Sequence, residues 1–266
     1  MTAHRYALLA HGGAGSDNAN SDGTDRACER GLELMQSGSS ALDAACAAVE
    51  VLENDGRFNA GVGSRRRDDG SIQMDAACMD GARHKFGAVA VVEGFQNPVH
   101  IAHALLDEPY HLLAGDGAAR YATERGFTAL DESRVRGTGA KSSDTVGAVA
   151  WDGKQFAAAL STGGTGKSWR GRVGDVPLIG CGLYAGPSGA VAATGHGESI
   201  ALNMTAYRAY QLLEAGAPAD TVMQAVLSWF EAAQDIGILV VGAKDWAGGS
   251  NRSMAWSGRQ GLQQTG

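Results

Sequence analysis

Glycine is the residue that most constrains how this chain can fold. The sequence contains 39 glycines among 266 residues, roughly twice the usual share of about 7%. The glycines follow no three-residue period and only 5 prolines accompany them, which excludes a collagen-like triple helix. Because 44% of the residues are hydrophobic and 19% are charged, the composition also excludes a disordered chain. Since glycine permits tight turns and close backbone contacts, we expect a packed core connected by compact loops.

The charge balance limits the possible partners. The chain carries 22 basic and 29 acidic residues, a net charge of −7. Nucleic acids and anionic membranes attract basic surfaces, so neither is expected as a partner. We expect a small-molecule substrate, and an anionic substrate would need a locally placed cation. No apolar run has the length of a membrane span or of a signal peptide's hydrophobic region, so we expect a cytoplasmic protein.

Residue spacing gives no indication of metal or redox chemistry. The four cysteines are widely separated and form no C-x-x-C pair, so we expect them to be buried free thiols. The seven histidines show no H-E-x-x-H or comparable ligand spacing. The sequence therefore predicts neither a catalytic metal nor an organic cofactor.

Hydrophobic periodicity predicts strands and helices in both halves of the chain. Strands are expected at 5–10, 72–79, 86–92, 145–151, 155–160, 190–193, 236–241 and 253–256. Two helices are expected before residue 57, the second starting at Ser40, where Asp43 completes a capping box. Further helices are expected at 97–106, 112–125, 198–214 and 218–232. Residues 126–144 lack periodicity and are the best linker candidate. This order predicts a layered α+β domain with sheet inside and helices outside.

One glycine-rich segment suggests a different class of protein. Residues 161–168 nearly match a phosphate-binding P-loop, but Ser161 stands at the first glycine position. A P-loop also needs a helix directly after its Lys-Ser pair, and two glycines and Pro177 follow instead. A glycine-rich nucleotide-binding protein remains the alternative from a different class. A serine hydrolase of the G-x-S-x-G type is not supported, because no such motif occurs.

Several short motifs, taken together, indicate a family more specifically than any of them does alone. In chain order they are His11-Gly12-Gly13-Ala14-Gly15, Phe58-Asn59-Ala60-Gly61-Val62-Gly63-Ser64, Met74-Asp75-Ala76-Ala77-Cys78-Met79-Asp80-Gly81, Asp144-Thr145-Val146-Gly147-Ala148-Val149-Ala150, Ser161-Thr162-Gly163-Gly164, Gly171-Arg172-Val173-Gly174-Asp175 and Ala193-Thr194-Gly195-His196-Gly197-Glu198. From about residue 7 to about residue 216, this set resembles the plant-type L-asparaginase and isoaspartyl peptidase family of N-terminal nucleophile hydrolases.

The resemblance implies a four-layer αββα sandwich, made as a precursor that cuts its own chain between Asp144 and Thr145. The single domain 1–266 would then consist of an α subunit, 1–144, with the linker at about 126–144, and a β subunit, 145–266. Cleavage would give the Thr145 hydroxyl, a poor nucleophile, a base on the same residue. An α-amino group titrates near about 7.7–8.0, so much of it is free amine at neutral pH.

The resemblance also assigns roles to other residues. Thr162 would orient or activate Thr145, and Thr194 and Gly195 would form the oxyanion hole. Arg172 and Asp175 would bind the α-carboxylate and α-ammonium of an aspartyl group. The remaining implied site residues are Asn59 near the nucleophile, and Gly163, Val173, Gly174, His196 and Gly197 around the substrate.

These roles imply an amidohydrolase that releases L-aspartate from β-aspartyl dipeptides, L-asparagine or both. An aspartylglucosamine hydrolase is the alternative within the family, where Asp also precedes the nucleophile. The resemblance further implies a dimer of cleaved αβ units. It allows a structural sodium ion held by backbone carbonyls of residues 52–63.

Overall fold

The structure is a computed structural model that describes residues 3–135 and 145–264. Its larger sheet has seven strands in the order β11-β1-β5-β6-β2-β3-β4. They are β1 (Ala3–His11), β2 (Met74–Asp80), β3 (Lys85–Val92), β4 (Leu112–Ala114), β5 (Val146–Trp151), β6 (Phe156–Thr162) and β11 (Trp256–Gln264). Neighbouring strands are antiparallel except for β3 and β4. The sheet therefore joins the two halves of the sequence, with β5 and β6 between β1 and β2.

A second sheet packs on the first and is entirely antiparallel in the order β10-β9-β8-β7. Its strands are β7 (Leu183–Gly186), β8 (Gly189–Gly195), β9 (Ile236–Val241) and β10 (Trp246–Ser250). A buried cluster that includes Leu9, Leu160, Leu183 and Leu239 fills the space between the sheets. The strands β5, β6, β8 and β9 are buried on both faces. This explains why most of their residues are apolar or small.

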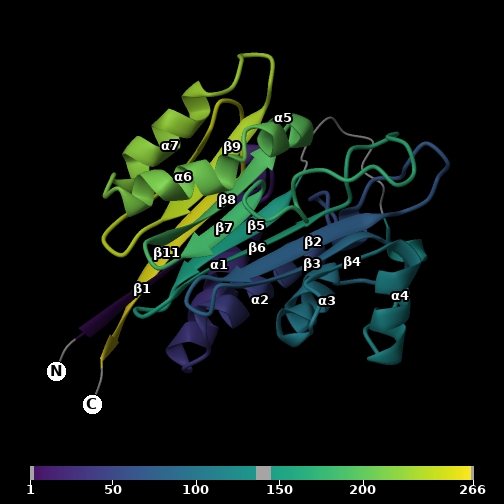
Figure 1. Cartoon of the computed structure of the whole chain (residues 1–266), viewed down its shortest axis with the longest axis horizontal. Helices are drawn as coiled ribbons and strands as arrows, with labels where there is room; N and C mark the ends of the chain where they lie inside the picture. Colours follow the sequence, from purple (N-terminus) through teal and green to yellow (C-terminus); the bar gives the residue numbers. More distant parts are fainter. Residues whose placement is uncertain (1–2, 136–144, 265–266) are drawn as a thin grey trace.

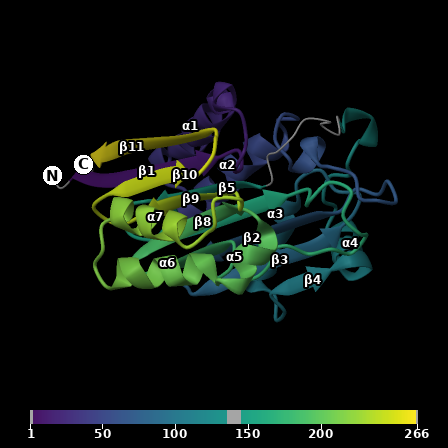
Figure 2. The same ribbon diagram turned by 90° about the horizontal axis from the view of Figure 1, so that it is seen from above.

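Helices cover the outer faces of both sheets (Figures 1 and 2). The larger sheet is covered by α1 (Ser21–Gln36), α2 (Ala41–Glu53), α3 (Pro98–Ala104) and α4 (Gly115–Glu124). The smaller sheet is covered by α5 (Gly197–Leu202), α6 (Thr205–Glu214) and α7 (Ala219–Ser228). Short 3-10 turns are η1 (Asn18–Asn20), η2 (Gly61–Gly63), η3 (Leu105–Asp107) and η4 (Glu132–Arg134). This confirms the predicted αββα sandwich.

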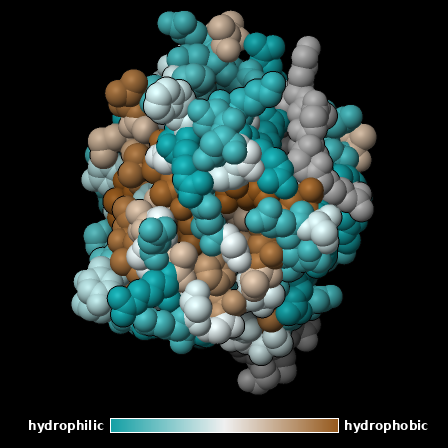
Figure 3. Space-filling model, turned by 90° about the vertical axis from the view of Figure 1, so that its right-hand side faces the viewer, coloured by the Kyte–Doolittle hydropathy of each residue, from teal (hydrophilic) through white to brown (hydrophobic). Residues whose placement is uncertain are grey.

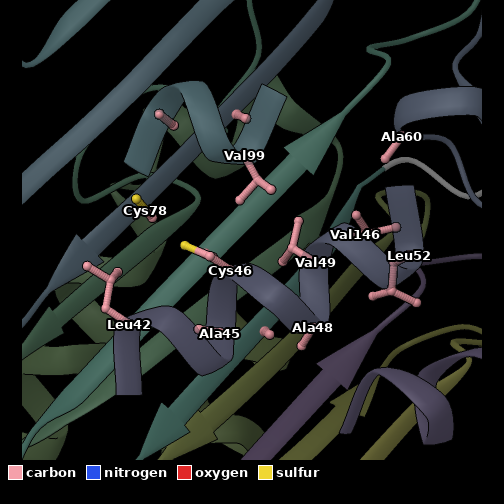
Figure 4. Close-up of a cluster of buried hydrophobic side chains, with 14 of the residues drawn as sticks. Leu42, Ala45, Cys46, Ala48, Val49, Leu52, Ala60, Cys78, Val99 and Val146 are labelled. Carbon is pink, nitrogen blue, oxygen red and sulfur yellow. The ribbon is translucent and has the colours of Figure 1, made fainter. Parts of the chain in front are cut away.

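Helix α2 shows how local sequence produces this packing. Ser40 is its N-cap, and the Ser40 and Asp43 side chains form the predicted reciprocal capping box. The side chains of Leu42, Val49 and Leu52 are buried toward the larger sheet, as the 3.6-residue period predicts (Figure 4). The cluster they join includes Val146, the residue after Thr145. The apolar face of α2 therefore supports the start of β5.

The structure corrects several predicted elements. The first three residues of the helix predicted at 112–125 form β4, because they pair with β3 and extend the larger sheet at its edge. The helix predicted at 198–214 is two helices, since Met204 takes a left-handed conformation with φ of 46°. The last strand starts at Trp256 and continues to Gln264 rather than spanning 253–256. Strands β7 and β10 were not predicted, because both are short and glycine-containing.

Part of the predicted linker is ordered against the α3 side of the domain. The N–H of Leu130 donates to the carbonyl of Gly94 at 2.9 Å, and that of Gln96 donates to Thr128 at 3.1 Å. Residues 136–144 lie outside the described residues. Within the described ranges, no helix combines the length and apolarity needed to cross a membrane.

Strand register places several sequence motifs at one end of the sandwich. Ala3 of β1 pairs with Gln264 of β11, so the chain termini share one end (Figure 1). At the opposite end of β1, His11 pairs with Gly147 near the start of β5, and Val146 pairs with Ser161 near the end of β6. Figure 3 views the molecule from its right-hand side in Figure 1, where an apolar band runs between hydrophilic surfaces.

Candidate active site

Thr145 lies immediately before β5, where the two sheets meet. Its residue is only 4% exposed. Its carbonyl oxygen accepts a hydrogen bond from the Thr194 hydroxyl of β8 at 3.4 Å. Thr194 Oγ1 also accepts the N–H of Ala14, from the glycine-rich loop after β1, at 3.2 Å. Three segments far apart in sequence therefore converge on Thr145.

Thr162 ends β6, next to Thr145. It is 3% exposed, and its hydroxyl oxygen accepts the N–H of Gly164 at 3.0 Å. Gly164 has a φ of +71°, a conformation that glycine adopts readily, so the chain turns sharply after Thr162. This turn brings the Gly164 backbone beside the nucleophile candidate.

A small pocket opens at this point. Its lining combines three threonines, four glycines and a pair of opposite charges. The lining residues are Thr145, Thr162, Gly164, Thr165, Arg172, Gly174, Asp175, Gly195 and Gly197. Seven of these nine were predicted as site residues from sequence; Gly164 and Thr165 were not. The opposite charges of the lining suit a small zwitterionic group.

Arg172 is held at the pocket by a carboxylate outside the predicted set. Its Nε and Nη2 donate to the two carboxylate oxygens of Glu198 at 3.0 and 2.9 Å. Burial lowers the pKa of Arg172, but the hydrogen bonds and charge of Glu198, together with the charges of Asp175 and Asp75, outweigh burial, and the net pKa is raised. Glu198 is the last residue of the motif 193–198. Its place in that motif was the sequence signal that could have identified it as a site residue.

Asp175 is the buried anion of the pocket. It is 4% exposed, and burial raises its pKa to about 7 even though the Arg172 charge acts in the opposite direction. A Cβ on Gly197 would lie 2.9 Å from Asp175 Oδ1 and 2.8 Å from Arg172 Nη2. Glycine at position 197 therefore leaves room for a ligand to reach both charges.

The predicted oxyanion residues are Thr194 and Gly195. Gly195 lines the pocket at a φ of +141°, and a Cβ there would overlap the carbonyl oxygen of Asp235. Thr194 is fully buried behind the pocket, and its hydroxyl donates the hydrogen bond to the Thr145 carbonyl described above. The two residues thus stand on the same side of Thr145.

Four other predicted residues do not line the pocket. Asn59 is buried behind it, and its Nδ2 donates to the carbonyl of Gly164 at 2.8 Å, which fixes the turn after Thr162. Gly163 packs against Asn59, since a Cβ on Gly163 would lie 2.5 Å from Asn59 Oδ1. Val173 is 38% exposed, and His196 is an exposed N-cap of α5 whose Nδ1 accepts the Ser199 N–H at 3.4 Å. Asp144 lies outside the described residues.

His11 is a buried neighbour to which the sequence assigned no role. Its ring is fully buried, and a Cβ on Gly147 of β5 would lie 2.6 Å from His11 Nε2. Burial lowers the pKa of His11 to about 3, so the ring is neutral at physiological pH. The only sequence signal was its place in the motif 11–15.

The structure does not support the P-loop alternative. Residues 163–174 contain turns and irregular backbone, and no helix directly follows Lys167 and Ser168. A phosphate group would therefore find no helix N-terminus here. Among the described residues, no three His, Cys, Asp or Glu side chains gather closely enough to hold a metal ion.

Comparison with known proteins decides the family. A family model described as asparaginase matches residues 4–141 and 136–258. The chain is 36% identical over 282 residues to the isoaspartyl peptidase/L-asparaginase of Rattus norvegicus, covering 94% of this chain and 85% of the relative. It is 41% identical over 238 residues to the plant-type L-asparaginase of Pyrobaculum calidifontis, covering 78% and 79%. The chain belongs to the asparaginase family.

This asparaginase-family protein is therefore an amidohydrolase of the asparaginase type. The relative from Mus musculus, also named isoaspartyl peptidase/L-asparaginase, is 38% identical over 94% of this chain and 86% of its own length. Because the similarity covers both halves of the chain, it includes the segments that carry Asn59, Thr145, Arg172 and Gly195.

Proposed function

We propose that this asparaginase-family protein uses Thr145 as an N-terminal nucleophile after cleavage of the Asp144–Thr145 bond, and releases L-aspartate from β-aspartyl dipeptides and L-asparagine. The observation that carries the proposal is the shared pocket: a buried threonine, a guanidinium and a buried carboxylate line the same small pocket. An aspartyl group presents the complementary α-carboxylate and α-ammonium, with its side-chain carbonyl directed at the threonine.

The chemistry needs no partner base from another residue. In the cleaved enzyme, the α-amino group of Thr145 takes the hydroxyl proton while Oγ1 attacks the side-chain carbonyl carbon of the substrate. The carbon–nitrogen bond then breaks, the leaving amine or ammonia takes the proton, and an aspartyl ester remains on Thr145. A water molecule attacks this ester, releases L-aspartate and restores the hydroxyl.

The surrounding residues stabilise the charge that develops on the carbonyl oxygen. The Thr194 hydroxyl and the Gly195 N–H are the donors we assign to the oxyanion, which forms beside the buried Thr145. Arg172, oriented by Glu198, binds the α-carboxylate, and Asp175 binds the α-ammonium. A bound ammonium favours the charged form of Asp175, whose buried carboxyl has a raised pKa of about 7.

Two further expectations belong to the proposal. The carbonyl oxygens of Glu53 and Phe58 lie so close to Gly61 and Gly63 that a Cβ at either glycine would overlap them. We expect a sodium ion held by backbone carbonyls of the loop 52–63, where it would stabilise the loop around Asn59. The working form is a dimer of two αβ units, each a single folded domain.

The proposal is tested by intact mass under denaturing conditions. Wild-type protein should give two fragments, 1–144 and 145–266, while Thr145→Ala should stay whole and inactive. Thr123→Ala changes an exposed threonine on α4 and should cleave normally. A wild-type chain that stays whole and still hydrolyses β-aspartyl dipeptides at full rate would refute the mechanism. Comparing β-aspartyl dipeptides, L-asparagine and aspartylglucosamine then identifies the substrate.

A further inference from the structure

Gln73 is a buried amide that no step of the proposed function uses. It is 4% exposed and directly precedes β2. Met74, the first residue of β2, pairs with Val92 of β3, so Gln73 and Glu93 follow each other's strand just beyond this pair. On its other side, the same end of β2 lies beside the end of β6 that carries Thr162. Gln73 therefore lies at the end of the larger sheet where the pocket opens.

The side chain of Gln73 joins the sheet to the turn 169–172, whose last residue is Arg172. Its Oε1 accepts the N–H of Gly171 at 2.7 Å, and its Nε2 donates to Glu93 Oε1 at 2.8 Å. A backbone N–H can only donate and an ionised carboxylate can only accept, so these two partners determine which end of the amide faces Gly171. Glu93 therefore holds the Gln73 oxygen at the residue immediately before Arg172.

The ion pairs of the same turn are exposed. Arg170 pairs with Asp69 and Glu93, and all three side chains are more than a third exposed. Exposed ion pairs contribute little to stability because water screens them. The bond from Gly171 instead ends on the buried side chain of Gln73, where water competes less for the acceptor. We therefore expect the Gln73 bond to hold the turn more firmly than the ion pairs do.

We propose that Gln73 is a positioning residue that sets where the Arg172 guanidinium meets the α-carboxylate of the aspartyl substrate. The inference rests on the function proposed above. Gln73 does not line the pocket and acts through Gly171. The guanidinium of Arg172 is bonded to Glu198, and its backbone is held through Gly171 by Gln73. Both ends of Arg172 are thus fixed before the substrate binds, which lowers the cost of ordering it on binding.

Substitutions at position 73 separate the hydrogen bond from the size of the side chain. Gln73→Met keeps an unbranched chain of similar length but offers the Gly171 N–H only a weak sulfur acceptor. The turn then loses its bond to the sheet, and the position of Arg172 is no longer fixed from its backbone side. The exchange Gln73→Glu with Glu93→Gln keeps an oxygen for Gly171 and a hydrogen bond between positions 73 and 93. The exchange variant should therefore behave as the wild type does.

The experiment measures the affinity for L-aspartate by calorimetry, because this ligand carries the α-carboxylate but no bond to be cleaved. Gln73→Met should weaken binding by about five- to a hundredfold, the range for a buried group left without its hydrogen-bond partner. The exchange variant should bind within about threefold of the wild type. Asp69→Asn is the matched control and should change the affinity by less than about twofold, since it removes an exposed charge that pairs with the same turn.

Chain cleavage, read by intact mass, is the second readout. The proposed cleavage of the Asp144–Thr145 bond involves no substrate carboxylate, so Gln73→Met should still give two fragments. General damage to the pocket would instead reduce both cleavage and L-aspartate binding. An uncut Gln73→Met chain would therefore overturn the inference, because the effect of Gln73 would then extend beyond Arg172.

Three further results would overturn the inference: unchanged L-aspartate binding in Gln73→Met, an exchange variant that binds no better than Gln73→Met, or an equal loss in Asp69→Asn. If Gln73→Met does not fold, Glu93→Ala takes its place. This half-exposed substitution frees the amide to turn its oxygen away from Gly171, so binding should weaken at least about threefold, and an unchanged affinity overturns the inference. A wild-type enzyme that does not hydrolyse β-aspartyl substrates would instead refute the proposed function, so the two failures are distinguishable.

Discussion

Asp175→Asn should stabilise the substrate-free protein at neutral and alkaline pH, although it removes the carboxylate that we assign to the α-ammonium of the substrate. The carboxyl of Asp175 is 4% exposed, and its Oδ2 makes no hydrogen bond with the described residues. Its pKa is about 7 in the folded protein, against 3.8 for an ordinary aspartate. Ionising this group therefore costs more in the folded state than in the unfolded chain, and an asparagine avoids that cost.

The magnitude follows from the two pKa values. Below pH 3.8 the carboxyl is protonated in both states and costs nothing. As pH rises, the unfolded chain loses the proton first, so stability falls until the folded pKa of about 7 is passed. At about 1.4 kcal/mol per pKa unit, the cost is about 1 kcal/mol at pH 4.5 and about 4 kcal/mol at pH 8.

Urea unfolding of both proteins at the two pH values isolates this effect. We expect the advantage of Asp175→Asn over the parent to grow by about 3 kcal/mol between pH 4.5 and pH 8. Any constant effect of the amide cancels in this difference. Both proteins should carry Thr145→Ala, because we expect that chain to stay uncut. The unfolding transition is then that of a single polypeptide.

Asp220→Asn, on the exposed N-terminal turn of α7, is the control and should change stability by less than about 0.5 kcal/mol at either pH. The reasoning is refuted if the advantage of Asp175→Asn is the same at both pH values. It is equally refuted if that advantage is larger at pH 4.5, because a raised pKa can act only in the other direction.

Three further predictions concern the scaffold of the site. Leu52→Ala removes a fully buried side chain of α2 and should lower the free energy of unfolding by roughly 2–5 kcal/mol, whereas Leu202→Ala, at an 88% exposed position, should change it little. Ser40→Ala removes the N-cap of α2 and should cost about 1 kcal/mol in the same urea assay; no loss would mean that the capping box is not contributing. The ring resonances of His11 should not titrate between pH 8 and 5, because its pKa is about 3, and a midpoint near 6.5 in an NMR titration would contradict the burial of the ring.

Local signals account for most of the correctly predicted elements. Ser40 and Asp43 correctly predicted where α2 begins. The spacing of its apolar residues identified the buried face around Val49. Predictions failed where pairing or backbone conformation overrode local preference, as at β4, which is held by its register with β3. The break between α5 and α6 at Met204 is a similar case, since a methionine side chain does not predict a left-handed conformation.

The candidate site was predictable to the extent that its residues belong to short motifs. Thr145, Thr162, Arg172 and Asp175 meet at one pocket, as the motif order implied. Motifs do not tell which residue faces the pocket and which supports it. Asn59 fixes a turn from behind the pocket lining, because register and burial decide where each side chain points.

The sequence by itself determined the family of this protein, its α+β layering and the identity of its candidate nucleophile, since each depends on residue order along the chain. The tertiary structure decided the electrostatics. Arg67 and Asp75 are ordinary charged residues in the sequence, and only the packing of β2 against β6 and the loop around Gly164 buries them beside Thr162 and Gly164 of the pocket. Burial strengthens charge interactions and shifts pKa values, and burial is a property of the folded chain rather than of any local motif.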